Sequence, residues 1–533
     1  MIDIGAPMGV DRADPEVPEL SAGRRVSCDG ERATVRYVGP VPPTAGVWLG
    51  VEWDNPERGK HDGSHGGVRY FACRHAEGGS FVRPAKVSWG VDYLTAVRQV
   101  YESQAEKVLS EDISIASKKL KWIGIEDRSF QSLPSALLGR SEVNGPGAAG
   151  EIRRATPNVS WLDISRSLLS CWDDVSAITQ QLERLEGLQL SNNRLRLTSD
   201  LSAHWGSFRS LKVLVLNGCD LTWPQVLQCA PMWPQLEDLC VENNNVTELQ
   251  RPDAVLQSLK SLSVSGNRLV QRSVLSLAAL PRLEHLNLSR TGLSDIRFDD
   301  AAPGAQTALF PALTKLTVDD NNISEWRVVD ELGKLAALTH FSCRGNRLAS
   351  VDGNARTAGQ LLIAKLGGLL VLNNCEVQHK ERRGAELDYI KMFGTEWLEA
   401  GGRSQAGGRS QASAQFIGQH PRYLRLIDKY GAPEEGELKK PEPFALKNQL
   451  LKITFVFPDD ADRKPIEKKV LASMVVQKVK GLLYRLLKVP AADLKLSYTS
   501  TKMLGTEFEI DSDMKTLQFY SIEDGDQVLV RWS

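Results

Sequence analysis

The chain lacks most of the features that mark membrane, secreted and nucleic-acid-binding proteins. No apolar run in its 533 residues reaches the about 18 residues that a membrane-spanning helix needs. The first twenty residues are acidic and dotted with proline, without the basic and apolar stretches of a signal peptide, so we expect none. A net charge of −1 provides no overall attraction to nucleic acid or to an anionic membrane. We therefore expect a cytoplasmic protein that binds neither.

Clustered metal ligands and catalytic motifs are also missing. The eight cysteines are scattered with no CxxC pair, whereas zinc needs clustered thiolates or imidazoles. Several lie in apolar repeats, where a free cysteine behaves as a small hydrophobic residue. There is no GxSxG, no HExxH and no kinase-like set of motifs. The sequence predicts a reduced, non-enzymatic protein that holds no metal and no cofactor.

The length predicts several domains, because single cores rarely grow beyond about 250–300 residues. Residues 20–92 contain short β-type runs separated by glycine and proline, which is typical of a small all-β barrel. Residues 93–157 begin with apolar residues at helical spacing, which favours a connecting helix followed by a loop-rich segment.

The middle of the chain is repetitive. Segments beginning at Leu185, Leu211, Leu236, Leu259, Leu283, Leu313 and Leu338 match LxxLxLxxN/CxL at intervals of 23 to 30 residues, the pattern of leucine-rich repeats. The alternating leucines indicate short strands, and the Asn or Cys is expected to turn inward at the bend. One copy cannot bury its own apolar face, so the copies must stack. Residues 158–392 are predicted to form an α/β solenoid with a C-terminal cap.

The remainder contains a linker and one further domain. Residues 393–446 include the Gly/Ser-rich GGRSQAGGRSQ and are expected to form a flexible linker. Residues 447–533 follow the order ββ, α, then more strands, which resembles the α+β β-grasp of ubiquitin. The chain ends in RWS without the Gly-Gly that conjugation requires, so we expect a binding module.

The stretch GKHDGSHGGVRYF (residues 59–71) allows several interpretations. Its glycines are typical of a surface loop. His61 and His65 could also indicate a metal site, and Gly59–Lys60 could indicate a phosphate-binding loop. On a glycine-rich loop the two imidazoles are not aligned, and the spacing for GxxxxGK[ST] is wrong. Together with GVWLGVEW and GGSFVRP, however, the stretch strongly resembles the CAP-Gly domain, which is built on a GKNDG loop.

This resemblance implies binding of acidic C-terminal tails that end in an aromatic residue, such as the tail of α-tubulin. Glycine allows backbone N–H groups to approach a terminal carboxylate, which is a known mode of peptide capture. Lysine adds a cation, and aromatic residues can flank an aromatic side chain. The expected tail-binding residues are Trp48, Trp53, Gly59, Lys60, His61, Asp62, Gly63, Ser64, Phe81 and Arg83.

Two questions about these residues stay open. Position 61 is His where the family usually has Asn, and neutral His offers one ring N–H whose tautomer depends on its surroundings. Tail binding is therefore expected to be weaker or pH-sensitive. Trp48 and Trp53 have an alternative interpretation as part of the barrel core.

The order of CAP-Gly barrel, leucine-rich repeats and ubiquitin-like domain resembles the tubulin-folding cofactor E family. The resemblance implies a cytoskeleton-associated chaperone of α-tubulin that assembles or splits the α/β-tubulin dimer. The implied partners are tubulin cofactors D, C and B, an Arf-like small GTPase, and the proteasome through the ubiquitin-like domain. The alternatives are a microtubule-associated adaptor and a ubiquitin-pathway adaptor.

Acidic residues of the repeats are the candidates for a second contact. They fall on or beside the expected strands, where a solenoid presents one continuous concave sheet. Solvation of exposed faces explains most such charges, and a partner-binding concave surface explains the rest. The candidates are Asp238, Glu242, Asp319 and Asp320.

Overall fold

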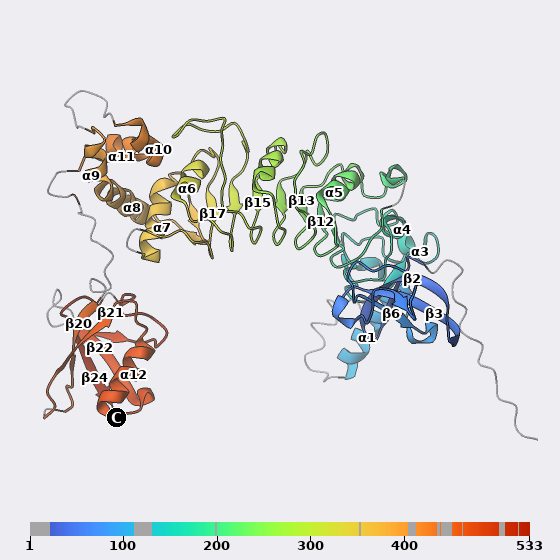
Figure 1. The fold of residues 1–533 in the computed structure, drawn as a ribbon, viewed down its shortest axis with the longest axis horizontal. Coiled ribbons are helices and arrows are strands. Elements are labelled where there is room, and N and C mark those ends of the chain that lie inside the picture. The colour runs from blue at the N-terminus through green and yellow to red at the C-terminus, as the bar shows by residue number, and fades with distance from the viewer. Residues whose placement is uncertain are drawn as a thin grey trace, which may run out of the picture. The chain divides into compact units, whose positions relative to one another are not determined.

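The computed structural model describes residues 22–110, 130–197, 200–350, 353–402, 412–433, 438, 450–460, 462–499, 507–520 and 522–532. The chain divides into two compact units, residues 1–348 with 359–438, and residues 349–358 with 439–533. The first unit contains a small β domain and the repeats, and the second contains the C-terminal β-grasp domain (Figure 1).

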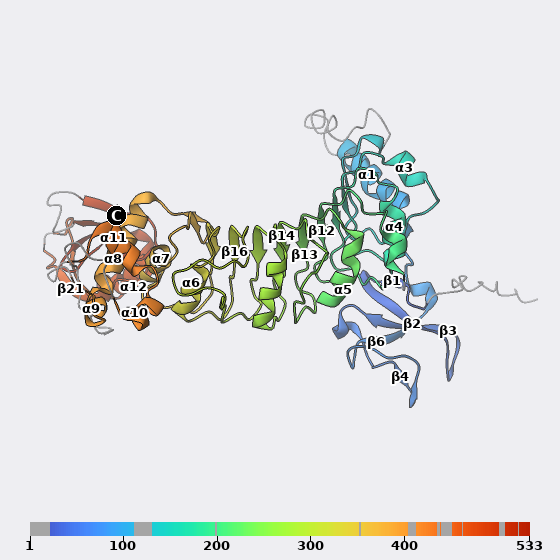
Figure 2. The same cartoon turned by 90° about the horizontal axis from the view of Figure 1, so that it is seen from above.

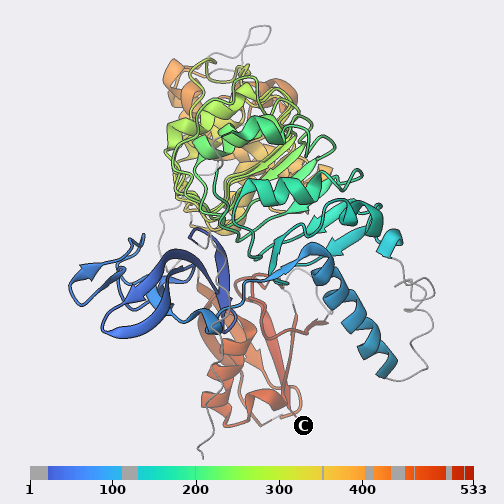
Figure 3. The ribbon, with the colours of Figure 1, turned by 90° about the vertical axis from the view of Figure 1, so that its right-hand side faces the viewer.

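The N-terminal domain is an antiparallel sheet with strand order β1-β2-β3-β6. Its strands are β1 (Arg25–Cys28), β2 (Glu31–Val41), β3 (Thr44–Trp53) and β6 (Gly79–Val82), and they curve strongly (blue in Figure 3). Successive side chains of a strand point to opposite faces. Leu49, Val51 and Trp53 therefore fill the core together with Val26 and Val35. The predicted all-β domain is confirmed.

A short segment joins this domain to the solenoid. It contains β7 (Val91–Asp92), α1 (Tyr93–Ser110), β8 (Ser135–Leu137), β9 (Val143–Gly145) and α3 (Glu151–Ala155). The carboxylate of Asp92 accepts a hydrogen bond from the backbone N–H of Thr95 (2.9 Å) and so caps α1. Figure 2 shows α1 and α3 close to α4.

Residues 93–157 are expected from the sequence to end in a loop-rich segment, but part of that segment belongs to the sheet of the repeats. Strand β8 pairs in parallel with the first repeat strand, and β9 pairs with β7. Ala136 and Leu138 are completely buried in the same core as the repeat leucines. The short apolar runs around these two residues lack the repeat spacing, so the sequence pattern did not assign this segment to the solenoid.

Eleven short strands form one sheet in the described part of the repeat region. All pairs are parallel except the last, β18 with β19. Figure 1 shows β12, β13, β15 and β17 side by side. The strands are β8, β10 (Trp161–Asp163), β11 (Gly187–Gln189), β12 (Val213–Val215), β13 (Asp238–Cys240), β14 (Ser261–Ser263), β15 (His285–Asn287), β16 (Lys315–Thr317), β17 (His340–Ser342), β18 (Val371–Leu372) and β19 (Cys375–Glu376). The leucine-rich-repeat prediction is confirmed.

Helical segments complete most of the repeats. They lie between the strands of the sheet in sequence and bury residues such as Trp172 and Trp223 in the common core. They are α4 (Trp172–Thr179), α5 (Trp223–Cys229), a 3₁₀ helix at Gln271–Ala279, α6 (Trp326–Leu332) and α7 (Ala355–Lys365).

Inward side chains hold the bends together. Asn321 donates through Nδ2 to the carbonyls of Leu288 (2.8 Å) and Val318 (2.9 Å). Its Oδ1 accepts from the backbone N–H groups of Thr291 and Leu293 (3.0 Å each). Each such amide therefore satisfies backbone groups of its own repeat and of the preceding one. Asn193, Asn244, Asn267 and Asn346 make equivalent bonds, and Cys219 and Thr291 each donate to a bend carbonyl.

Helices occupy much of the expected linker at residues 393–446. After α8 (His379–Met392) come α9 (Gly394–Glu399), α10 (Ala414–Gln419) and α11 (Tyr423–Tyr430). Trp397, Phe416 and Tyr423 are buried in the solenoid core. The linker prediction is therefore wrong for these helices, because a few aromatic residues bury enough surface to order a region whose composition is otherwise polar. The duplicated GGRSQ segment lies outside the described residues.

The second unit contains a β-grasp fold. Strand order is β21-β20-β24-β22-β23, with the central β20 and β24 parallel. The elements are β20 (Leu450–Val456), β21 (Ile466–Leu471), α12 (Val476–Leu487), β22 (Leu494–Thr499), β23 (Glu507–Ile510) and β24 (Gln527–Trp532). Helix α12 buries Val476, Val479 and Leu483 against the sheet. The predicted ubiquitin-like domain is confirmed.

A substitution at Leu262 tests whether the repeat leucines form one stacked core. Its side chain is 1% exposed at the centre of β14, between Leu239 and Leu286 of the adjacent strands. Leu262→Asp buries an unpaired carboxyl group and should lower the free energy of unfolding of the repeat region by roughly 3–5 kcal/mol or more.

The matched control is Ser261→Asp, because Ser261 is the preceding strand residue and points to the opposite face. We expect it to change stability by no more than about 0.5 kcal/mol. Chemical denaturation followed by circular dichroism measures both variants. Equal destabilisation by the two would contradict the inward orientation of Leu262.

Candidate functional site

The glycine-rich loop Gly59–Ser64 lies against strand β6 of the N-terminal domain. The backbone N–H of Lys60 donates to the carbonyl of Gly79 (2.7 Å), and the N–H of Gly79 donates to the carbonyl of His61 (2.8 Å). A Cβ at position 59 would lie 1.7 Å from the carbonyl oxygen of Glu77, so only glycine fits there. Gly63 has φ +101°, a conformation that L side chains rarely adopt. The loop is thus an ordered part of the barrel with a defined backbone conformation.

Two consecutive side chains hold the tip of this loop. Nδ1 of His61 accepts from the backbone N–H of Gly63 (3.0 Å), and Oδ1 of Asp62 accepts from the N–H of Ser64 (3.0 Å). In neutral His61 the proton must therefore be on Nε2. Nδ1 of His61 is thus the acceptor that holds the turn at Gly63.

The backbone donors of the loop are largely occupied. The N–H groups of Gly59, Lys60 and His61 donate to backbone carbonyls, and those of Gly63 and Ser64 donate to the two side chains just described. This differs from the expectation that these N–H groups capture a terminal carboxylate. The groups left to face a ligand are side chains, of which the exposed Lys60 carries the positive charge.

An aromatic cluster adjoins the loop. Phe81 contacts the rings of Tyr37 (6.4 Å between centroids), His61 (5.0 Å), His65 (6.2 Å), Tyr70 (5.4 Å) and Phe71 (5.5 Å). Sequence reasoning missed Tyr37 and Tyr70, although Tyr37 occurs in a recognisable β-type run and Tyr70 in the glycine-rich stretch itself. The cluster provides a partly exposed aromatic surface next to Lys60.

The two tryptophans have different roles. Gly50 pairs with Phe81 across the sheet, so Trp48 and Phe81 share the outer face by strand alternation. Trp48 is partly exposed, with the guanidinium of Arg83 at 3.8 Å from its ring centroid. Trp53 points to the opposite face, is 5% exposed and belongs to the core. Its expected place in the tail site is therefore wrong.

Local electrostatics fix the charge states of the loop. Hydrogen bonds from the side chain and the backbone N–H of Ser64 lower the pKa of Asp62, so this carboxyl group is ionised. Burial lowers the pKa of His61 from 6.5, with smaller contributions from His65 and Lys60. The loop therefore presents neutral His61 between one fixed anion and one fixed cation at neutral pH.

Contacts with the repeats hold the β domain in the first unit. Arg74 forms ion pairs with Glu52 of the barrel and Asp220 of the repeats. Ser88 donates to Glu142 (2.7 Å), and Asn144 donates to the carbonyl of Trp89 (2.8 Å). These contacts are between residues distant in sequence, and no local pattern indicates them.

The four acidic candidates of the repeats do not form one site. Asp238 and Glu242 lie on the open face of one repeat, and Ser263 donates to Glu242 (2.5 Å). Asp319 accepts from Ser342 (2.7 Å) and pairs with Arg344. Asp320 lies at a bend with φ +55°. Strands β13 and β16 are three positions apart, or roughly 14 Å at the usual strand spacing.

No group of three or more His, Cys, Asp or Glu side chains among the described residues is arranged to hold a metal ion. Of the helices in the same residues, none is long and apolar enough to cross a membrane.

Comparisons with known proteins agree with this architecture. The CAP-Gly domain family model matches residues 22–87, and the ubiquitin-like domain model matches residues 454–531. The tubulin-specific chaperone E of Danio rerio is 58% identical over 517 residues, covering 96% of this chain and 99% of the relative. The Homo sapiens protein of that name is 49% identical over 519 residues, covering 96% and 98%. The solution structure of the C-terminal ubiquitin-like domain of mouse tubulin-specific chaperone e is 54% identical, covers 16% of this chain and 88% of that chain, and has a TM-score of 0.16.

Fold and family models together define a multidomain protein with CAP-Gly, leucine-rich-repeat and ubiquitin-like domains. Similarity over nearly the whole length makes the assignment specific. The chain belongs to the tubulin-specific chaperone E family of non-enzymatic chaperones.

The bond between His61 and Gly63 predicts a pH dependence of the loop. Because the pKa of folded His61 is below 6.5, the unfolded loop binds more protons near pH 6. The contribution of neutral His61 to loop stability is therefore present above about pH 6.5 and is lost as pH falls through the lowered pKa. Hydrogen exchange of residues 59–71, corrected for intrinsic rates, should show weaker protection at pH 5.5 than at pH 7.5.

His61→Asn should remove this dependence, because asparagine keeps the acceptor at every pH. His65→Asn is the matched control and should retain it, since no bond to Gly63 is changed. Equal pH dependence in the wild type and His61→Asn would contradict the role assigned to Nδ1.

Proposed function

We propose that this protein is a chaperone of α-tubulin that binds the acidic C-terminal tail through the Gly59–Ser64 loop and the globular body through the repeats. With other tubulin cofactors, it then assembles or dissociates the α/β-tubulin dimer. Membership of the tubulin-specific chaperone E family supports the client. The observation that supports the tail site is the exposed Lys60 beside the aromatic cluster of Phe81.

At the tail site, Lys60 and the Nε2–H of His61 contact the terminal carboxylate. Since five backbone N–H groups of the loop already have partners, these side chains make the main polar contacts. The terminal aromatic ring of the tail lies on the outer face of the sheet, against Phe81 and Trp48. Arg83, which covers Trp48, adds a second positive charge for an acidic tail.

On the repeats, the open face of the sheet contacts the body of α-tubulin. Asp238 and Glu242 are the stronger candidates, because they point from the face of β13 and its continuation. Asp319 and Asp320 are weaker, because the first is paired with Arg344 and the second is a bend residue.

The ubiquitin-like domain contacts a further factor. Tubulin cofactors D, C and B, an Arf-like small GTPase and the proteasome are the proposed partners of the whole assembly. Any GTP hydrolysis in this assembly belongs to the partners. A role as an adaptor in the ubiquitin pathway is the alternative, and the match of residues 454–531 to the ubiquitin-like family favours it.

Lys60→Ala tests the tail site. A charge-assisted hydrogen bond contributes about 1.5–3 kcal/mol, so the variant should weaken binding of an acidic, aromatic-ended peptide roughly 10- to 130-fold. Amidation of the peptide's C-terminus should weaken wild-type binding by a similar factor. In Lys60→Ala the effect of amidation should be much smaller, because the pair is already broken.

The measurement is a titration with acid and amide forms of the same peptide. Lys86→Ala is the matched control, because Lys86 is another exposed lysine of the same domain and lies in a different segment. Equal affinity of the wild type for both peptide forms would show that the loop does not recognise the end of a chain.

A further inference from the structure

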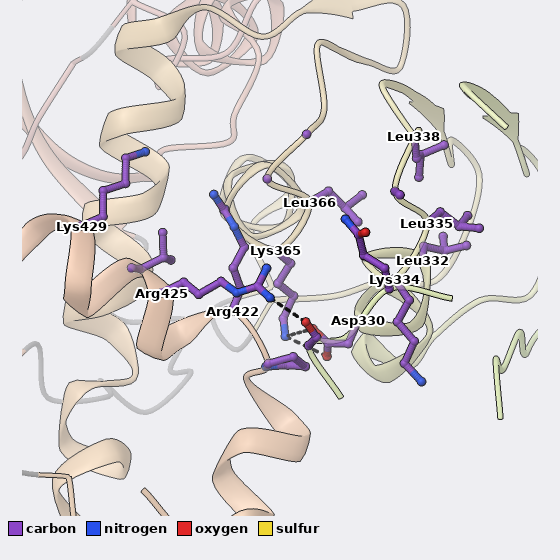
Figure 4. Close-up of a pocket in the computed structure, with 18 residues that line it drawn as sticks. Asp330, Leu332, Lys334, Leu335, Leu338, Lys365, Leu366, Arg422, Arg425 and Lys429 are labelled. Atoms are coloured by element: carbon purple, nitrogen blue, oxygen red, sulfur yellow. Dashed lines mark hydrogen bonds and ion pairs between the residues drawn. The ribbon is translucent and has the colours of Figure 1, made fainter. Parts of the chain in front are cut away.

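A positively charged cavity lies at the C-terminal end of the solenoid. It has a volume of about 410 Å³ and lies between the end of α6, the residues after α7, and helix α11 (Figure 4). This volume is within the roughly 300–1,000 Å³ of typical ligand pockets. Nothing in the tail-binding scheme uses this cavity.

The charge of its lining is strongly unequal. Five cationic side chains line it against one carboxylate, that of Asp330. Lys365 donates to both oxygens of Asp330 (2.8 and 2.9 Å), so this pair is neutral as a whole. The remaining cations are Lys334, Arg422, Arg425 and Lys429.

Two of these cations are directed away from the centre. Figure 4 shows the ammonium groups of Lys334 and Lys429 at opposite edges. Lys334 donates to the carbonyls of Phe298 (3.0 Å) and Ala301 (2.7 Å), and Lys429 donates to Glu386 (2.8 Å). These bonds keep both ammonium groups at the edges, so the guanidinium groups of Arg422 and Arg425 are the cations on which a ligand in the cavity would depend.

Arg422 is the N-cap residue of α11, and Arg425 lies three residues later in its first turn. Arg422 is fixed by bonds to Glu386 (2.5 Å) and the carbonyl of Ala364. A Cβ at Gly367 would lie 2.5 Å from its guanidinium, so that glycine makes room for it. Arg425 is exposed and donates through Nη2 to the carbonyl of Gly304 (2.9 Å). A guanidinium has five N–H donors, which leaves capacity for an additional acceptor on each.

Much of the remaining wall is aliphatic, although Gln306 also lines the cavity. Leu335, Leu338, Leu366 and Leu426 line the cavity together with Pro421. A small inorganic anion makes no use of such a wall. The methylene groups of glutamate, or an apolar neighbour of an acidic residue, would cover it while a carboxylate reaches the arginines.

We propose that this cavity binds an acidic peptide segment of a partner protein, with a side-chain carboxylate between Arg422 and Arg425. Unlike the loop at Lys60, it requires no free C-terminus, because a guanidinium group can donate to a side-chain carboxylate as well as to a terminal one. The proposal does not depend on the tail site and can hold if that site fails.

The test uses the full chain and a fluorescent, glutamate-rich peptide with an amidated C-terminus, which removes the terminal carboxylate that the loop is proposed to bind. Arg425→Glu should weaken binding at least roughly 10-fold by reversing one contact charge. Gln306→Glu, which adds a carboxylate to the exposed rim, should weaken it roughly 2- to 5-fold. Binding should also weaken as salt is raised.

Arg383→Glu is the matched control, since it makes the same charge change on exposed α8 without lining the cavity. It should leave affinity nearly unchanged, as should Lys60→Ala. All variants should keep the wild-type melting temperature. Equal weakening by Arg383→Glu, no weakening by Arg425→Glu, or displacement of the peptide by an equimolar amount of inorganic phosphate would overturn the proposal.

Discussion

The inward amides at the bends are the interaction on which the rest of the structure depends. Each one bonds to the backbone of two successive repeats, as Asn321 does with Leu288 and Thr291 of the preceding repeat and with Val318 of its own. An unpaired buried N–H costs about 1–3 kcal/mol, so a repeat without its neighbour is not stable. The solenoid therefore needs an additional structure at each end. Strand β8 with α1 serves at the first end, and α8 to α11 serve at the second.

The second of these end structures lines the basic cavity, and the CAP-Gly domain that carries the tail site is joined to the first part of the solenoid. At the first end, the ion pair of Arg74 with Asp220 and the pairing of β7 with β9 connect the CAP-Gly domain to the repeats. At the second end, Glu386 is 0% exposed and is surrounded by Arg422, Lys429 and Tyr430. Burial alone would raise the pKa of Glu386, but its hydrogen bonds hold the pKa at about 2. This ionised carboxylate fixes the arginine that lines the basic cavity.

Sequence patterns predicted the elements that rest on local rules. The leucine and asparagine spacing gave the solenoid, and GKHDG with its neighbouring strands gave the CAP-Gly domain. The patterns failed where contacts between distant residues decide. The outward or inward direction of Trp48 and Trp53 depends on the sheet, and the pairing of Asp319 depends on Arg344 of the next repeat. Helix α10 is held by contacts of Phe416 with Tyr423 and of His420, its C-cap, with Tyr389. Two of the occupied N–H groups of the loop, those of Lys60 and His61, depend on the carbonyl of Gly79, which no local pattern connects to them.

The central claim is that the protein acts on soluble tubulin rather than on the polymer. The most direct measurement mixes the purified full chain with α/β-tubulin, in the presence of cofactor D to accept β-tubulin, and separates the products by size. The account predicts a complex that contains this chain and α-tubulin without β-tubulin, together with loss of the dimer. Sedimentation of the chain with intact microtubules, without any loss of dimer, would contradict it.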